Sequence, residues 1–181
     1  MCDGMMEGMI IFVTGRKGSG KTLTMVKDAI NYSYDGLKIY SNFQTSVSQK
    51  ILSNKEILQM DRDTDLQDCV LLIDEIQILF DSRRSPKKEN IGFSNFIQQI
   101  RKRGIILIAS TQYSGTVDLR FRQHVDILVK PRHYKNYDVC EVTYIDLNSI
   151  DEDNTEPSSV TMVFDARTVY NSYNTKERIL I

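Results

Sequence analysis

The chain has 181 residues, of which 41% are apolar and 26% are charged, and this suits one compact domain. Its 23 basic and 24 acidic residues leave a net charge of −1, so a nucleic-acid partner would need a local basic patch or a pore formed by several subunits. No apolar run approaches the roughly 18 residues of a membrane span and the N-terminus lacks signal-peptide features, so we expect a cytoplasmic protein.

Apolar runs and helical spacings alternate along the chain. The run CVLLID at 69–74 is continuous, as in a strand buried on both faces, and Phe96, Ile97 and Ile100 follow helical spacing up to a stop at Gly104. The expected elements are strand 9–14, helix 23–30, strand 38–43, helix 53–60, strand 69–74, a basic loop at 82–90, helix 91–103, and strands 105–110, 125–130, 138–145 and 160–164. This order predicts an α/β fold with a mostly parallel central sheet flanked by helices.

The segment GRKGSGKT at 15–22 matches G-x(4)-G-K-[ST] and lies between an expected strand and an expected helix. Glycines in this loop let backbone N–H groups face phosphates, Lys21 would reach the β- and γ-phosphates, and the Thr22 hydroxyl would bind Mg²⁺. The residues assigned to nucleotide binding are Gly15, Arg16, Lys17, Gly18, Ser19, Gly20, Lys21, Thr22 and Leu23. The motif predicts ATP and Mg²⁺ as ligands; a chance glycine turn is the alternative.

The segment VLLIDE places Asp74 and Glu75 at the end of a buried strand. Two carboxylates there would be costly without a cation or a polar partner. Asp74 would hold Mg²⁺ through its water shell, and Glu75 would polarise the attacking water. The alternative is an acidic turn that caps the next helix.

An acidic residue directly after the strand-terminal aspartate resembles the additional-strand, catalytic-glutamate class of P-loop ATPases. The segment RKRGIILIASTQ is similar to the FtsK/HerA superfamily, whose members carry Arg-x-x-Gly, an apolar strand and Thr-Gln. This resemblance implies that strand 105–110 lies in space between the strands 9–14 and 69–74. It also implies that Gln112 lies beside the γ-phosphate as a sensor.

Within that superfamily, the succession IYSN, LLIDE, RKRG and STQ is similar to two families over residues 9–131. They are the genome-packaging ATPases of membrane-containing viruses and the zonula occludens toxin-like ATPases of filamentous phages. The resemblance implies a single P-loop ATPase domain over 1–181, with a motor core at about 9–131 and C-terminal strands in 132–181 that complete it. The transmembrane segment and following domain of the phage proteins have no counterpart in this sequence.

Motors of this kind complete each active site with an arginine from the neighbouring subunit. Arg101 matches the Arg-x-x-Gly position, and the alternatives are Arg103, Arg120 and Arg122. The basic loop contains Arg83, Arg84, Lys87 and Lys88, which in a ring could hold the phosphates of double-stranded DNA. A solvated surface is the other interpretation of both sets of residues.

The sequence therefore predicts an ATP-driven motor that translocates double-stranded DNA and packages a viral genome into a capsid. It would act as a homo-oligomeric ring of five or six subunits, together with a capsid or membrane vertex protein, and a viral protein of this kind would lie in the host cytoplasm or on the virion. One alternative is an ATPase that drives assembly or export of filamentous virions. A more distant alternative is a small P-loop kinase, which would have an arginine-rich lid and would leave Gln112 without a role.

Overall fold

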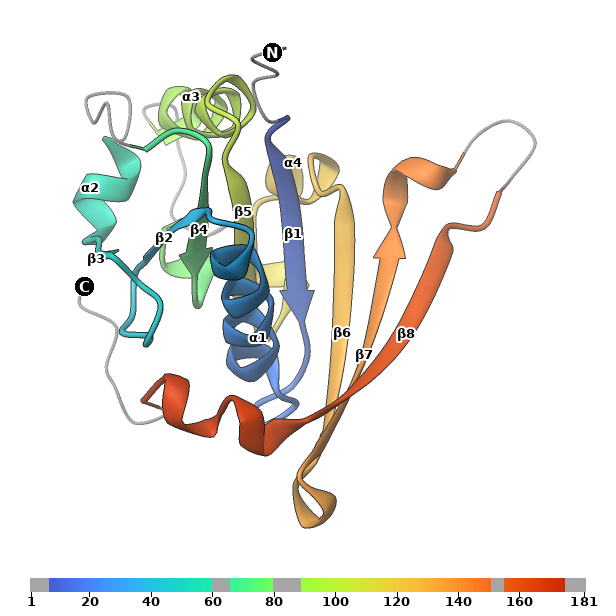
Figure 1. The fold of residues 1–181 in the computed structure, drawn as a ribbon. Coiled ribbons are helices and arrows are strands. Elements are labelled where there is room, and N and C mark those ends of the chain that lie inside the picture. The colour runs from blue at the N-terminus through green and yellow to red at the C-terminus, as the bar shows by residue number, and fades with distance from the viewer. Residues whose placement is uncertain (1–6, 60–65, 80–88, 151–154, 175–181) are drawn as a thin grey trace, which may run out of the picture.

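The structure is a computed structural model that describes residues 7–59, 66–79, 89–150 and 155–174, with the backbone alone for 89–94. These residues form an eight-stranded sheet in the order β3-β2-β4-β5-β1-β6-β7-β8, with helices on both faces (Figure 1). The strands are β1 (Met9–Thr14), β2 (Lys38–Ser41), β3 (Lys50–Ile51), β4 (Cys69–Ile73), β5 (Ile106–Thr111), β6 (Ile127–Tyr134), β7 (Val139–Asp146) and β8 (Ser158–Asp165). The α-helices are α1 (Lys21–Tyr34), α2 (Asn54–Leu58), α3 (Glu89–Lys102) and α4 (Leu119–Gln123).

The sheet is parallel from β3 to β6 and ends in two antiparallel hairpins, β6–β7 and β7–β8. Strand β5 pairs with β1 on one side and with β4 on the other, which confirms the inserted strand expected from the sequence. Because neighbouring parallel strands end at the same edge, the segments after β1, β4 and β5 meet there. The predicted α/β class with a mostly parallel sheet is confirmed.

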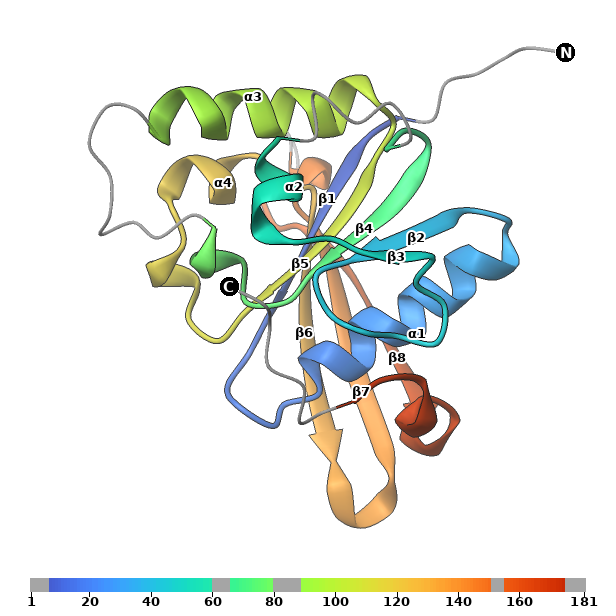
Figure 2. The same cartoon turned by 90° about the vertical axis from the view of Figure 1, so that its left-hand side faces the viewer.

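Two layers of apolar side chains hold the helices against the sheet. Figure 2 shows the sheet between α1 on one face and α2, α3 and α4 on the other. Alternate side chains of β1 point to opposite faces, so Ile10 and Phe12 pack with α2, α3 and α4, whereas Ile11 and Val13 pack with α1. Every residue of β4 is buried, as its continuous apolar sequence predicts. In the described residues no helix is long and apolar enough to cross a membrane.

Some elements differ from the expectations. The two-residue β3 and the five-residue α4 were not expected, because neither is long enough to show a periodic pattern. Helix α3 begins at Glu89, inside the expected loop 82–90, and residues 80–88 lie outside the described chain. The expected end of the helix at Gly104 is confirmed: α3 ends at Lys102, and Gly104 has a left-handed φ of 60°.

After β8 the chain returns to the phosphate-loop end of the sheet. Two 3₁₀ turns, Ala166–Thr168 and Tyr170–Ser172, lead it past α1 towards the loop that follows β2 (Figure 1). There Thr45 forms an antiparallel bridge with Tyr173, and the Ser46 amide donates to the Ser172 carbonyl at 2.7 Å. We call residues 166–174 the C-terminal strap.

Candidate active site

The loop between β1 and α1 has the compact shape that its glycines allow. A Cβ at Gly15 would lie 2.5 Å from Ser19 Oγ, and a Cβ at Gly20 would lie 3.1 Å from both Cys140 Sγ and His133 Cβ. Gly18 and Gly20 also have φ values of 80° and 96°, which side-chain-bearing residues rarely adopt. The positive φ values and the contact with Ser19 therefore favour glycine in this loop, and Gly20 packs closely against β6 and β7.

Lys21 is the first residue of α1, and its side chain folds back over the loop. Its Nζ donates to the carbonyl oxygens of Gly15 at 3.0 Å and Arg16 at 3.4 Å, and the residue is 7% exposed. The amides at the start of α1 lie beside this ammonium, so a positive charge and a helix N-terminus share one site. That combination suits phosphate groups.

Asp74 lies directly after β4 and receives three hydroxyl and amide donors. The Thr22 hydroxyl donates to its Oδ2 at 3.1 Å, the Ser110 hydroxyl donates to its Oδ1, and the Glu75 amide donates to Oδ1 at 3.2 Å. Burial raises the pKa of Asp74 above its ordinary value; the Ser110 hydrogen bond opposes the shift, and the charge of Glu75 adds to it. A buried carboxylate of this kind is stabilised by a cation.

The donor set fits Mg²⁺. A hydroxyl and a carboxylate oxygen that face each other, with space for phosphates and water, are typical of magnesium sites in nucleotide-binding proteins. The described residues contain no cluster of three His, Cys, Asp or Glu side chains that could hold a metal without a further ligand. Thr22 and Asp74 would therefore bind Mg²⁺ together with the phosphates of a nucleotide.

Glu75 is held by amide side chains in a special backbone conformation. Its φ and ψ are 55° and 56°, a left-handed conformation that costs a non-glycine residue roughly 1 kcal/mol or more. Its Oε1 accepts from Gln112 Nε2 at 2.9 Å, and its Oε2 accepts from Gln77 Nε2. The structure thus brings Glu75 and Gln112 into contact beside the phosphate loop.

Two residues of this site were not assigned from the sequence. Asn42 follows β2 and forms two hydrogen bonds with the backbone of Asp74. Its Nδ2 donates to the Asp74 carbonyl oxygen at 3.0 Å, and its Oδ1 accepts from the Asp74 amide at 2.8 Å. Ser110 lies in β5 and also accepts from the Glu75 amide at 3.2 Å. Both are polar residues near the carboxyl ends of β2 and β5, the strands that neighbour β4. Once the strand order is known, this position predicts that their side chains lie beside Asp74.

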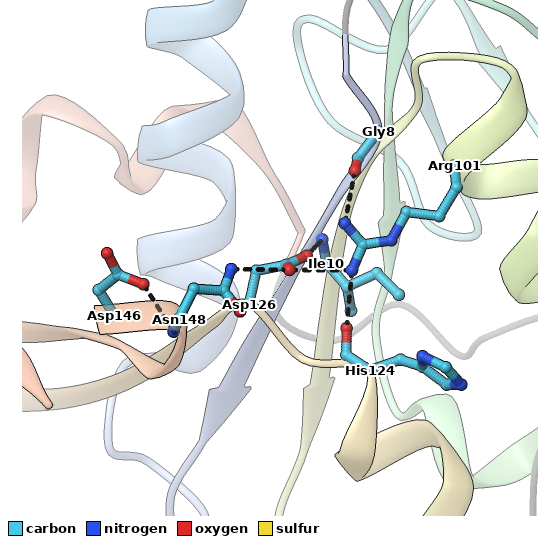
Figure 3. Close-up of polar contacts among 7 residues, drawn as sticks. All are labelled: Gly8, Ile10, Arg101, His124, Asp126, Asp146 and Asn148. Carbon is cyan, nitrogen blue, oxygen red and sulfur yellow. Dashed lines mark hydrogen bonds and ion pairs between the residues drawn. The ribbon is translucent and has the colours of Figure 1, made fainter. Parts of the chain in front are cut away.

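Arg101 lies at the opposite end of β1. Its guanidinium donates to the carbonyl oxygens of Gly8 at 3.0 Å and His124 at 3.3 Å, and pairs with Asp126 at 2.9 Å (Figure 3). Since β1 has six residues, this cluster is about 20 Å along the strand from its own phosphate loop. A role for Arg101 as a finger concerns a neighbouring subunit and stays a prediction.

Arg103 and Arg120 bond to residues outside the site of their own chain, whereas Arg122 lines a hollow together with Thr14, the residue directly before the phosphate loop. Arg103 donates to Gln99 at 2.8 Å, and Arg120 pairs with Asp118 at 2.6 Å. Arg122 is exposed on α4. The basic-loop residues Arg83, Arg84, Lys87 and Lys88 lie outside the described residues.

Two hollows flank the phosphate loop. One, of about 780 Å³, is lined by residues 14–16 and 112–116, beside Gln112. The other, of about 720 Å³, lies on the side of β6 and β7 and combines the loop with His133, Lys135, Tyr170 and Tyr173. A ligand that follows the loop can therefore extend towards either side of β1.

Comparisons with known proteins agree with this architecture. The sequence model of the Zonular occludens toxin (Zot) family matches residues 9–173. The crystal structure of the N-terminal domain of zonular occludens toxin from Neisseria meningitidis is similar, with a TM-score of 0.67 and 19% identity over 93% of this chain and 100% of that chain. No curated protein matches the chain in sequence.

Two further solved structures share the fold. The genome packaging NTPase B204 from Sulfolobus turreted icosahedral virus 2, in complex with ATP-gammaS, has a TM-score of 0.60 and 14% identity over 85% of this chain and 96% of that chain. The flagellar accessory protein FlaH from Methanocaldococcus jannaschii has a TM-score of 0.56 and 13% identity over 90% of this chain and 87% of that chain.

Strand β5 between β1 and β4, the phosphate loop after β1 and the Asp–Glu pair after β4 define a P-loop NTPase of the additional-strand, catalytic-glutamate type. Within that class, the chain belongs to the zonular occludens toxin family, whose sequence model spans most of its length.

Proposed function

We propose that the chain is an ATPase that uses ATP hydrolysis to translocate double-stranded DNA, as the genome-packaging motors of viruses do. The observation that carries the proposal is that Thr22, Asp74 and Glu75 lie together at one edge of the sheet. There Gln112 donates a hydrogen bond to the Glu75 carboxylate. These residues supply a phosphate site, a magnesium site and a base in one place.

In the proposed reaction, the amides of the loop and Lys21 bind the phosphates. Mg²⁺, held by Thr22 and Asp74, would neutralise part of their charge. Glu75 accepts a proton from a water whose oxygen attacks the γ-phosphorus while the bond to the β-phosphate oxygen breaks, and ADP and phosphate leave. The Gln112 amide can both donate to a phosphate oxygen and accept from the water.

The proposed motor is a homo-oligomeric ring of five or six subunits, in which an arginine of one subunit serves the ATP of the next. DNA would lie against the basic loop, and a capsid or membrane vertex protein would anchor the ring. The similar fold of B204, a genome packaging NTPase, supports the proposal of a packaging motor.

A second candidate is an ATPase that drives assembly or export of filamentous virions. The family match favours it, because the Zot sequence model covers residues 9–173 and the Neisseria domain is covered over 100% of its length. Both candidates need the same hydrolytic site and differ in what the energy moves.

The ATPase rate of the purified chain, with and without duplex DNA, separates the two candidates. A motor should hydrolyse ATP faster with DNA and form a ring in the presence of ATP, as measured by mass in solution. Lys21→Ala should abolish both rates, because it removes the ammonium from the loop. A rate that is unchanged by DNA would contradict the translocation proposal, and the absence of any Lys21-dependent rate would contradict the ATPase itself.

A further inference from the structure

The hollow on the β6–β7 side of the phosphate loop is built from two distant parts of the chain. Its floor consists of loop residues and the start of α1, and its wall consists of His133, Lys135, Tyr170 and Tyr173. The wall belongs to the C-terminal fifty residues, to which the sequence motifs assign no chemistry. Three of its four residues carry rings.

The direction of a bound nucleotide follows from the order of the strands. Glu75 and Gln112 follow β4 and β5, which lie on one side of β1, and a γ-phosphate has to lie near them for hydrolysis. Strands β6 and β7 lie on the other side of β1. The opposite end of the triphosphate, which carries the nucleoside, therefore points to the hollow with the ring side chains.

Two of these rings, those of His133 and Tyr170, are held in place by hydrogen bonds. The Tyr170 hydroxyl donates to Asp138 Oδ1 at 2.8 Å and lies 3.1 Å from His133 Nε2, with the two ring centroids 6.1 Å apart. Because that hydroxyl gives its proton to Asp138, His133 Nε2 is the donor in the second contact. Burial, and then the charge of Lys135, lower the pKa of His133, so its ring is neutral near pH 7.

The C-terminal strap is anchored at both ends, so Tyr170 and Tyr173 are held against the loop. Ala166 and Val169 are buried in the layer that contains α1, and the Ala166 amide donates to the Asp138 carbonyl at 2.7 Å. At the far end, Tyr173 pairs with Thr45. Figure 1 shows the strap crossing from β8 towards the β2–β3 side at the phosphate-loop end of α1.

Lys135 adds a positive charge to the same hollow. A Cβ at Gly18 would lie 3.5 Å from Lys135 Nζ, so this ammonium reaches the phosphate loop from the end of the β6–β7 hairpin. Lys21, which also lines this hollow, approaches the loop from α1 and donates to the Gly15 carbonyl at 3.0 Å. The loop thus has a second cation, contributed by a segment far from it in sequence.

We propose that His133, Tyr170 and Tyr173 form the nucleoside subsite of the ATP site, and that Lys135 contacts the phosphates. The proposal rests on the proposed ATPase function and assigns to the C-terminal segment the binding of the base and ribose. Aromatic side chains suit this ligand because a purine base stacks on them.

Tyr170→Ala tests the subsite, because the side chain is 38% exposed and its loss should leave the fold intact. Calorimetric titrations with ADP and with inorganic tripolyphosphate, both with Mg²⁺, separate nucleoside binding from phosphate binding. Tyr170→Ala should weaken ADP binding about tenfold or more and leave tripolyphosphate binding unchanged. Lys135→Ala should weaken the binding of both ligands.

Tyr137→Ala is the matched control, because Tyr137 is 77% exposed in the turn of the same hairpin and does not line the hollow. It should bind both ligands as the unmodified protein does. Tyr170→Phe keeps the ring and should retain most of the ADP affinity. The chain has no tryptophan, so Tyr170→Trp adds a single fluorophore whose emission should change with ADP and not with tripolyphosphate.

Wild-type ADP affinity in Tyr170→Ala, or an equal loss of ADP and tripolyphosphate binding, would overturn the subsite while leaving the ATPase proposal intact. Failure of the unmodified protein to bind either ligand would overturn both proposals. A tenfold loss for ADP alone supports the subsite.

Discussion

Replacing Arg101 with alanine should destabilise the fold, because its guanidinium ties together three chain segments at the amino end of β1. The change removes hydrogen bonds to Gly8 and His124 and the ion pair with Asp126. The arginine side chain is 37% exposed and Asp126 keeps its two other donors, so each lost contact costs less than a buried one. We expect a loss of about 2 kcal/mol, which lowers Tm by about 4 to 8 °C in a chain of this size.

Thermal and urea unfolding, followed by circular dichroism, measure this effect on the isolated protein. Arg120→Ala is the matched control, because that arginine pairs with Asp118 only two residues away and should cost little. The double change Arg101→Ala with Asp126→Asn should cost less than the sum of the single changes, because the two side chains share one contact.

The finger hypothesis makes a different prediction for the same variant. If Arg101 serves a neighbouring subunit, Arg101→Ala should lower the ATPase rate by about 10³-fold or more. Mixing the Arg101→Ala and Lys21→Ala proteins should then restore activity. If Arg101→Ala unfolds at the wild-type temperature, the stabilising role derived from the Asp126 cluster is wrong.

Four other changes test the site and the fold. Glu75→Gln should bind ATP normally and hydrolyse it slowly, since an amide cannot accept the proton of water; a wild-type kcat would remove Glu75 from that role. Gln112→Ala should leave nucleotide affinity nearly unchanged while uncoupling hydrolysis from DNA, and an equal large loss for ATP and ADP in titrations would exclude a γ-phosphate sensor. Neutralising the whole basic loop should reduce the slope of log K for DNA against log salt by about 0.9 per lost phosphate contact, whereas an unchanged slope would make the loop solvated surface. The residues changed together are Arg83, Arg84, Lys87 and Lys88. Burial acts to raise the pKa of Asp126, but its hydrogen bonds from Asn148, the Ile10 amide and Arg101 outweigh this and hold the pKa below its usual value. Its stabilising contribution is therefore complete above about pH 5 and is lost as the pH falls through the folded pKa, so Asp126→Asn should flatten the acid limb of stability measured by urea unfolding.

The parallel core of the fold could be predicted because its strands carry strong patterns. Long apolar runs mark β1, β4 and β5, and the resemblance of RKRGIILIASTQ to a superfamily placed β5 between the other two strands. Short elements carry no such pattern. Strand β3 has two residues and α4 has five, and the packing of the rest of the molecule decides their conformation.

The parts of the site that are formed by residues adjacent in sequence could be predicted. The parts formed by residues that only the sheet brings together could not. The loop residues and the Asp74–Glu75 pair are contiguous motifs. Ser110 looks like one small residue in a buried strand, and its hydroxyl gains a role only because β5 lies beside β4. Tyr170 and His133 are 37 residues apart, and no spacing rule in the sequence relates them.

The position of β5 also sets the earliest moment during synthesis at which nucleotide can stabilise the chain. Thr22 and Asp74 are both made before β5, yet β1 and β4 do not pair with each other, and within the sheet β5 (Ile106–Thr111) is the strand that lies between them. A nascent chain that ends before β5 has both halves of the phosphate site but lacks the strand that sets their separation, and distant pairings carry an entropic cost. If the chain binds ATP as proposed, ATP would favour the folded state only once β5 has left the ribosome, and it would then stabilise a sheet that is already assembled rather than nucleate folding.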